Sequence, residues 1–361
     1  MMGVMTIRGR GTAENPPNRF ETIRYEADPD ASAPSYQGWD GDDESPAPAT
    51  QFLRDTTRSI IAYNDSPDIG FEASINPYRG CEHGCVYCYA RPTHEYLGLS
   101  SGLDFETKIF VKEDAPELLR RELSHPRWQP KVIAISGVTD CYQPAERHFQ
   151  LTRRCLQILA EFRNPAGIVT KNHLVVRDLD VLTELVRYNA VCVFLSVTTL
   201  DNDLAGFMEP RATRPAGRLA AVEAIHRAGV PVGVMVAPII PGLTDHEVPS
   251  IVAAAARAGA GFAGYTMLRL PFAIKELFES WLGRHYPEKK DKVLSRIRSV
   301  REGKLNDPRF GSRMRGEGPI AETIADVFKL ACQRAGIYGR SPRLTADHFR
   351  RPGGQQGQLF D

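Results

Sequence analysis

Six short apolar runs, each followed by an amphipathic stretch of helical length, dominate the chain between residues 71 and 280. The runs are rich in β-branched residues, as buried parallel strands are. Such alternation predicts repeated βα units, and therefore a parallel sheet covered by crossover helices. The expected strands cover residues 72–76, 131–136, 167–170, 191–197, 232–237 and 262–268.

Six such units are fewer than the eight of a closed barrel. We therefore expect an α/β fold built on an open, partial (β/α)6 barrel over residues 71–280. In folds of this kind ligands bind at the carboxyl ends of the strands. Polar residues that follow the predicted strands are consequently candidates for a functional site.

The two flanks of the predicted barrel differ in character. Residues 1–70 are rich in Pro, Gly, Ser and acidic residues, with six Lys and Arg against twelve Asp and Glu. We expect a largely irregular extension there, either disordered or wrapped on the barrel. Residues 281–350 read as a basic, mostly helical subdomain with a helix near 319–335, and residues 351–361 as a flexible tail.

Composition also bears on the compartment. No apolar run approaches the about 18 residues that a membrane helix needs, and the N-terminus lacks the apolar stretch of a secretory signal. Seven cysteines, an odd number, do not indicate a disulfide framework. We expect a cytoplasmic protein without a membrane partner.

Three of the cysteines are clustered in a glycine-containing loop after the first predicted strand. Cys81, Cys85 and Cys88 form the pattern C-x3-C-x2-C, and three thiolates so spaced can converge on one metal centre. A structural zinc site would need a fourth ligand, which His83 or His94 could supply. A four-iron cluster held by three cysteines would instead keep one iron open. Spacing alone leaves both alternatives open.

The context of this loop carries a family resemblance. An aromatic residue, Tyr87, precedes Cys88, and the loop follows the first strand of a six-fold βα series. In both respects the chain resembles the radical S-adenosylmethionine (SAM) superfamily. The resemblance implies that Cys81, Cys85 and Cys88 bind a 4Fe-4S cluster and that SAM chelates its fourth iron. It also implies reductive cleavage of SAM to a 5′-deoxyadenosyl radical that abstracts hydrogen from a substrate.

Within that superfamily the chain looks closest to the spore photoproduct lyase and DNA repair photolyase branch. The similar stretches are CEHGCVYCYA, SGVTDCYQPAE, IVTKNHLVVRD, FLSVTT, MEPRATRPAGRLAAVEAIHRAG and VMVAPIIPG. By this resemblance, the residues that contact SAM are Tyr87, Tyr89, Thr139, Lys171, Ser196 and Ala237. Glu209 and Arg218 are expected to brace the nearby loop or to bind a charged part of the ligand.

One departure from that branch concerns the hydrogen donor. Spore photoproduct lyase has a cysteine where this chain has Gly137, which puts identical lesion repair in doubt. Cys141 could replace the missing donor or could simply pack in the core. Asp140 and Tyr142, on either side of it, are further catalytic candidates.

These features predict several binding partners. The basic C-terminal region and the resemblance favour a nucleic acid, with radical modification of a protein or small metabolite as the alternative. A structural metal-binding protein associated with nucleic acid is a third hypothesis. Radical SAM chemistry implies an electron donor such as flavodoxin or ferredoxin. The tail Gln356–Phe360 resembles the peptide that docks bacterial DNA enzymes on the replication sliding clamp.

Overall fold

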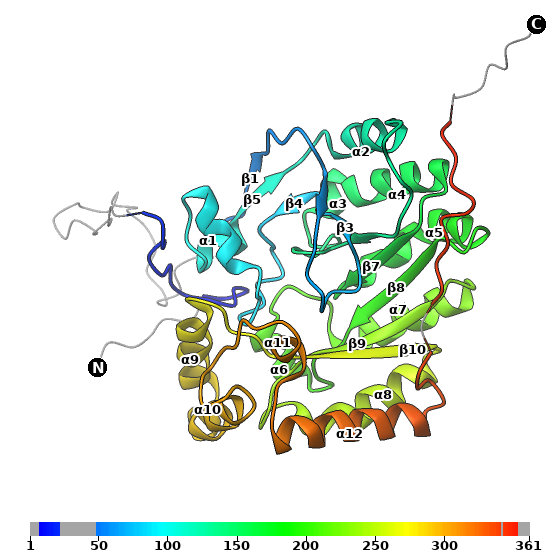
Figure 1. Cartoon of the computed structure of the whole chain (residues 1–361). Helices are drawn as coiled ribbons and strands as arrows, with labels where there is room; N and C mark the ends of the chain where they lie inside the picture. The colour runs from blue at the N-terminus through cyan, green and yellow to red at the C-terminus, as the bar shows by residue number, and fades with distance from the viewer. Residues whose placement is uncertain (1–6, 22–47, 341, 353–361) are drawn as a thin grey trace, which may run out of the picture.

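A seven-stranded sheet lies at the centre of the computed structural model, which describes residues 7–21, 48–340 and 342–352 (Figure 1). Its six parallel strands follow one another in chain order, and a short antiparallel strand, β2, pairs with the first of them. The strands are β2 (Ile61–Tyr63), β3 (Ala73–Ile75), β6 (Ile133–Ile135), β7 (Ala166–Thr170), β8 (Val191–Ser196), β9 (Val232–Ile239) and β10 (Phe262–Met267). The predicted α/β class and partial (β/α)6 barrel are confirmed.

Helices cover the sheet as crossover connections. Helix α4 packs between α2 and α5, and α12 packs on α8. The apolar sides of strands and helices meet in one large core, in which Ile135, Ile168 and Val234 are fully buried. The helices between the strands are α2 (Ala115–Ser124), α3 (Glu146–Phe149), α4 (Leu151–Phe162), α5 (Leu179–Val186), α6 (Asn202–Met208), α7 (Pro215–Arg227) and α8 (Val248–Arg257), with 3-10 turns η1 (Arg91–Leu97), η2 (His173–Asp178) and η3 (Asp245–Glu247).

A second, three-stranded sheet lies beside the barrel next to the short helix α1 (Leu103–Thr107). Its order is β1 (Gln51–Arg54), β5 (Lys108–Val111) and β4 (Tyr78–Arg79). Strands β1 and β2 both fall within residues 1–70, where we expected irregular structure. The prediction missed them because each is only three or four residues long and mostly exposed, too short for a regular strand pattern.

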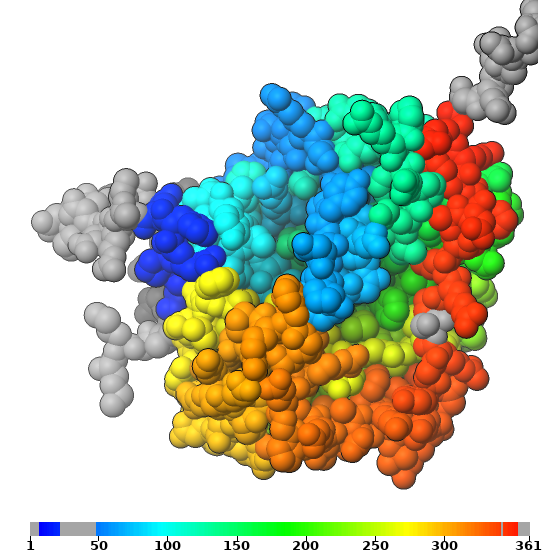
Figure 2. Space-filling view, viewed as in Figure 1, coloured from blue at the N-terminus to red at the C-terminus, as the bar shows by residue number. Residues whose placement is uncertain are grey.

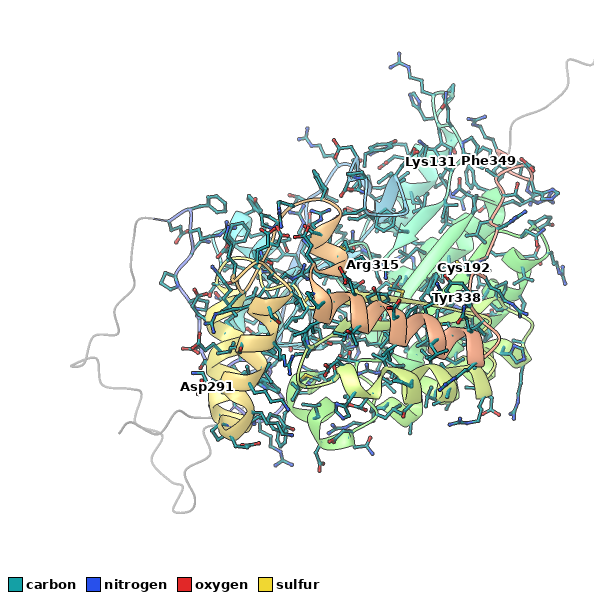
Figure 3. The ribbon with its side chains drawn as sticks, turned by 60° about the horizontal axis from the view of Figure 1, so that its bottom comes forward. Lys131, Cys192, Asp291, Arg315, Tyr338 and Phe349 are labelled. Atoms are coloured by element: carbon teal, nitrogen blue, oxygen red, sulfur yellow. The ribbon has the colours of Figure 1, made fainter. Side chains whose placement is uncertain are left out.

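The C-terminal region shares the core of the barrel, whereas the sequence suggested an appended subdomain over residues 281–350. Ile324 and Phe328 of α12 belong to the same apolar cluster as the sheet. Beyond α12 the chain returns along the barrel to Phe349 (Figure 3). The Arg350 amide then donates to the Phe162 carbonyl at 2.9 Å. The helices here are α9 (Ile274–His285), α10 (Lys290–Ser299), α11 (Ser312–Arg315) and α12 (Pro319–Arg334), with the turn η4 (Pro287–Lys289).

Two further expectations concern the outer parts of the chain. Residues Gln356–Phe360 lie outside the described residues, so the sliding-clamp hypothesis stays a prediction. Across residues 7–21, 48–340 and 342–352, no helix combines the length and the apolar character that crossing a membrane requires.

We predict that Ile168→Ala, in the central strand β7, lowers the free energy of unfolding by about 2–5 kcal/mol, because it leaves a cavity in a fully buried site. Tyr63→Ala, on the 70% exposed edge residue of β2, should cost less than about 1 kcal/mol. Urea unfolding of both variants measures this difference. Equal losses would contradict the placement of the core.

Candidate active site

The cysteine loop connects β4 to η1, beside the carboxyl ends of the parallel strands. Cys81 and Cys85 are buried and Cys88 is half-buried. Gly80 and Gly84 have left-handed φ angles of 81° and 68°, which let the loop turn back on itself. Burial raises the pKa of all three thiols, and Cys85 and Cys88 raise that of Cys81 further. All three thiols therefore lie in a desolvated part of the loop.

A fully buried arginine determines the shape of this loop. Arg91 donates from Nε to the Cys85 carbonyl at 2.9 Å and from Nη2 to the Gly84 carbonyl at 3.1 Å. The same Nη2 pairs with Glu106 Oε1 at 2.6 Å, and neither side chain is exposed to solvent. The guanidinium thus holds the loop through its backbone and leaves the thiols free.

The N-terminal segment 7–21, dark blue in Figure 2, lies at the surface next to the cyan part of the chain and contacts Glu106 of helix α1. Glu106 accepts hydrogen bonds from the amides of Gly11 at 2.9 Å and Thr12 at 3.1 Å. A Cβ atom on Gly11 would lie 1.7 Å from the Gly84 carbonyl oxygen, so only glycine fits there. These contacts agree with a wrapped extension for this segment.

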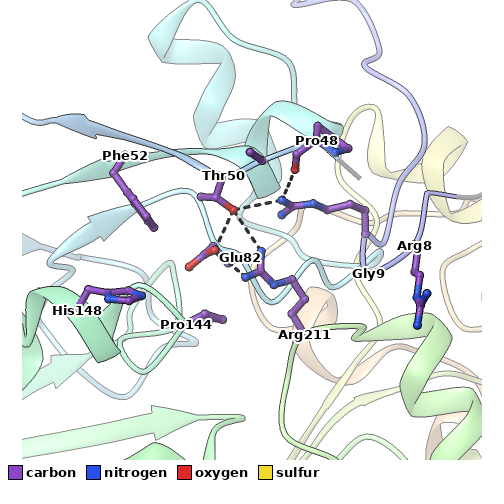
Figure 4. Close-up of a pocket in the computed structure, with 11 residues that line it drawn as sticks. Arg8, Gly9, Pro48, Thr50, Phe52, Glu82, Pro144, His148 and Arg211 are labelled. Carbon is purple, nitrogen blue, oxygen red and sulfur yellow. Dashed lines mark hydrogen bonds and ion pairs between the residues drawn. The ribbon is translucent and has the colours of Figure 1, made fainter. Parts of the chain in front are cut away.

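Glu82, next to Cys81, ties the loop to two more segments (Figure 4). Its Oε1 accepts from the Thr50 hydroxyl at 2.9 Å and pairs with Arg211 at 3.0 Å. Arg10 also donates to Thr50, at 3.2 Å. A cavity of about 520 Å³ adjoins this junction. Because Arg10 and Arg211 are both engaged in the junction, we interpret it as a structural tie.

A second buried network lies at the ends of β8 and β9. Glu209 pairs with Arg218 and accepts from the hydroxyls of Tyr87 and, at 2.8 Å, Thr198. Arg218 also donates to the Ser196 carbonyl at 2.9 Å. Burial opposes ionisation of Glu209, but Arg218 and Lys171 outweigh it and lower its pKa to about 2. The bracing role expected for Glu209 and Arg218 fits these contacts.

Lys171 follows β7 and brings an ammonium group to the same region. Its Nζ lies 5.9 Å from the ring centroid of Tyr87. Burial lowers its pKa, but Cys85 and Glu209 raise it by more, so the group stays charged. Within the described residues, no hydrogen bond or ion pair engages Nζ. The site therefore offers an unpaired cation to an anionic ligand group.

Asp140 links the ends of β6 and β7. It accepts from the Lys171 amide at 2.8 Å, the Thr170 hydroxyl at 2.7 Å and the Tyr142 amide at 2.9 Å, and it lies 3.4 Å from His83 Nδ1. Burial opposes its ionisation, but His83 and these hydrogen bonds lower its pKa to about 2. Asp140 is thus a fixed anion that orients the backbone of Lys171.

The other two catalytic candidates are buried. Cys141 is 1% exposed, and Tyr142 is inaccessible with its hydroxyl donating to Asp178 at 3.1 Å. A Cβ atom on Gly137 would lie 2.9 Å from the Ser74 side chain, so a larger residue there would require a shift. The geometry favours packing roles for Cys141 and Tyr142.

The remaining predicted SAM-binding residues surround the same space. Tyr89 is 47% exposed and donates to the Gly137 carbonyl at 3.0 Å. The Thr139 hydroxyl donates to the Tyr78 carbonyl at 2.7 Å, and the Ala237 carbonyl accepts from Thr198 at 3.1 Å.

The sequence did not indicate the roles of Arg91 and Glu106. Most of their partners are backbone atoms of other segments, and no local sequence pattern marks such contacts.

The histidines considered for a zinc site are engaged elsewhere. His83 contacts Asp140 and, through Nε2, Asn172 at 3.2 Å. His94 is buried against Phe105, and its Nε2 contacts the Lys108 carbonyl at 2.9 Å. In the part of the chain that the structure describes, no group of three or more His, Cys, Asp or Glu side chains is arranged to hold a metal ion. The ligand role of the three thiols stays a prediction, and these contacts favour a centre held by cysteine alone.

Comparison with known proteins gives a consistent result. Residues 75–255 match the family model described as the radical SAM superfamily. An uncharacterized protein of Mycobacterium tuberculosis is 37% identical over 292 residues, which cover 78% of this chain and 84% of that protein. An uncharacterized protein of Methanocaldococcus jannaschii is 29% identical over 219 residues, covering 61% of this chain and 78% of its own.

Solved structures of spore photoproduct lyase have a similar fold. The enzyme complexed with dinucleoside spore photoproduct superposes with a TM-score of 0.58 at 17% identity, covering 78% of this chain and 79% of that one. A variant with bound AdoMet and dinucleoside spore photoproduct gives a TM-score of 0.56 at 18% identity, with 78% of both chains covered.

We predict that Glu106→Gln destabilises the chain by roughly 3 kcal/mol, because it leaves buried Arg91 without its counter-charge. It should also speed alkylation of Cys81, Cys85 and Cys88, measured by peptide mass mapping. Glu161→Gln, which breaks the exposed pair with Arg120, is the control and should cost less than about 1 kcal/mol. Unchanged alkylation in Glu106→Gln would argue against the brace.

A second prediction concerns acid stability. Unfolded Glu has a pKa of about 4.3, above the folded value of about 2 for Glu209. Ionised Glu209 therefore stabilises the fold above its unfolded pKa, and this contribution is lost as pH falls from about 5 to about 2. Glu209→Gln should be less stable at neutral pH and show a shallower decline in acid. Urea unfolding at several pH values tests this, and parallel curves would refute it.

Proposed function

The chain belongs to the radical SAM superfamily, and we propose that this enzyme performs its radical chemistry on a nucleic acid. Members of the superfamily bind a 4Fe-4S cluster and SAM, which supply reductive cleavage of the sulfonium and, through it, hydrogen abstraction. The observation that carries the radical SAM part of the proposal is the ammonium of Lys171, which has no partner among the described residues. It lies at the strand ends together with the buried Cys81 and Cys85 and the half-buried Cys88.

Different residues of this chain would bind the cluster and SAM. Cys81, Cys85 and Cys88 would hold one cluster, in a loop that Arg91 keeps in shape. Lys171 would bind the carboxylate of SAM, since a charge-assisted hydrogen bond forms readily in a desolvated site. Ser196 would lie beside SAM at the end of β8, where Arg218 fixes its backbone.

Two considerations support a nucleic acid as substrate. The similar solved structures include spore photoproduct lyase with a dinucleoside lesion, and residues 281–361 carry seventeen Lys and Arg against nine Asp and Glu. Gly137 and the buried Cys141 argue against a lesion-repair step that returns hydrogen from a cysteine at either position. We therefore propose nucleic-acid modification or repair by a different final step.

The proposal also includes an electron donor and a cellular compartment. A flavodoxin or ferredoxin would supply the electron, because cleavage of SAM needs a low-potential donor. The cytoplasm fits this requirement, since it keeps free thiols such as those of the cysteine loop reduced.

The test uses the full chain, purified without oxygen, reconstituted with iron and sulfide, reduced and given SAM. We predict 5′-deoxyadenosine by mass spectrometry, lost in Cys81→Ala, Cys85→Ala and Cys88→Ala and kept in Cys192→Ala, which alters a buried strand residue. Lys171→Met should weaken SAM binding about tenfold or more, and Lys131→Met should not. Stimulation by ultraviolet-damaged DNA supports the nucleic-acid substrate. Stimulation only by a protein or metabolite would refute it.

A further inference from the structure

A cluster of arginines lies beside Tyr89, the residue that follows the third cysteine of the loop. Arg269 comes two residues after β10, and its guanidinium carbon lies 5.5 Å from the ring centroid of Tyr89. Tyr89 is itself anchored to the loop after β6 through the Gly137 carbonyl. Arg269 is therefore placed at the carboxyl ends of the strands, at the border of the proposed active site.

The cluster contains more positive than negative charge. Arg313 pairs with Asp68 at 2.5 Å, which balances that one cation. Arg301 is 1% exposed and donates to the carbonyls of Leu268 and Ser312, at 2.7 Å and 2.9 Å. Over the described ranges, no carboxylate lies within ion-pairing distance of Arg269 or Arg301. Two guanidinium groups thus have no ion-pair partner in the described part of the chain.

Arg269 is also short of hydrogen-bond partners. Its Nε is buried and has no partner among the described residues, and its Nη1 reaches only Met314 Sδ, at 3.7 Å. Burial, and then Arg313, lower its pKa. Arg269 is half-buried, and a partly desolvated guanidinium with free donors gains stability when it binds an anion. The planar, weakly hydrated guanidinium suits a phosphate group in particular.

Exposed aromatic rings flank the cluster. Tyr89 is 47% and Phe310 is 61% exposed, and Arg313 lies 4.5 Å from the ring centroid of Phe310. In Figure 2 the orange part of the chain lies at the surface next to the light-blue part that precedes the cysteine loop. Aromatic rings beside arginines are the pattern on which single-stranded nucleic acid stacks its bases while its phosphates are neutralised.

We propose that Arg269 binds a phosphodiester group of a single nucleic-acid strand, with a neighbouring base stacked on Tyr89. This inference rests on the nucleic-acid substrate proposed above and names the group that holds it at the border of the site. Arg301 adds long-range positive charge without touching the strand, because its side chain is fully buried.

The experiment measures binding of fluorescein-labelled single-stranded DNA to the full chain by anisotropy, over a series of salt concentrations and with two base compositions. Arg269→Gln should weaken binding about tenfold for both oligonucleotides. It should also reduce the slope of log K against log salt by about 0.7, the value for one lost phosphate contact on a single strand. Arg269→Lys keeps the charge and should restore the slope.

Arg257→Gln is the matched control, because Arg257 ends α8 at the opposite end of the barrel from Arg269. Thermal unfolding of each variant verifies that it folds. Unchanged affinity and slope in Arg269→Gln, while the wild-type chain binds, would overturn the Arg269 site alone. A loss confined to one base composition would also overturn it, since phosphates carry no sequence. Absence of binding by the wild-type chain would overturn the nucleic-acid substrate itself.

Discussion

The buried ion pair between Arg91 and Glu106 is the interaction on which the site depends. Removing both charges from water is costly, and the fold compensates by directing nearly every donor and acceptor of the pair to the backbone of three segments. The cysteine loop, helix α1 and the N-terminal segment 7–21 are consequently one unit. A loop so held can present three thiols in a defined shape without using them as structural contacts.

The second buried pair, Glu209 with Arg218, performs a related task at the other side of the site. Glu209 fixes the hydroxyl of Tyr87, while Arg218 fixes the backbone at Ser196. These charges are satisfied internally, whereas Lys171 makes no hydrogen bond or ion pair through Nζ with the residues that the structure describes. Paired charges thus support the site, whereas charges without a partner among the described residues are available to a ligand. The same contrast holds between Arg313, which pairs with Asp68, and Arg269, which has no such partner.

Much of the architecture was predictable from the chain. The six parallel strands were each predicted to within about two residues, since a buried parallel strand is a nearly continuous apolar run. Strands β1 and β2 were not predicted, because their extended form depends on pairing with β5 and β3, which a local sequence pattern does not show. Helix α12 was predicted as an element, but its packing on α8 depends on a contact between segments about seventy residues apart.

The site shows the same division between local and distant information. Sequence spacing was enough to single out Cys81, Cys85, Cys88 and the polar residues at the strand ends, because those positions follow from the order of elements along the chain. It could not place Arg91 against Glu106, Cys141 in the core or Arg269 over Tyr89. Each of these depends on burial and on which charges meet in space, and both arise only when distant segments pack together.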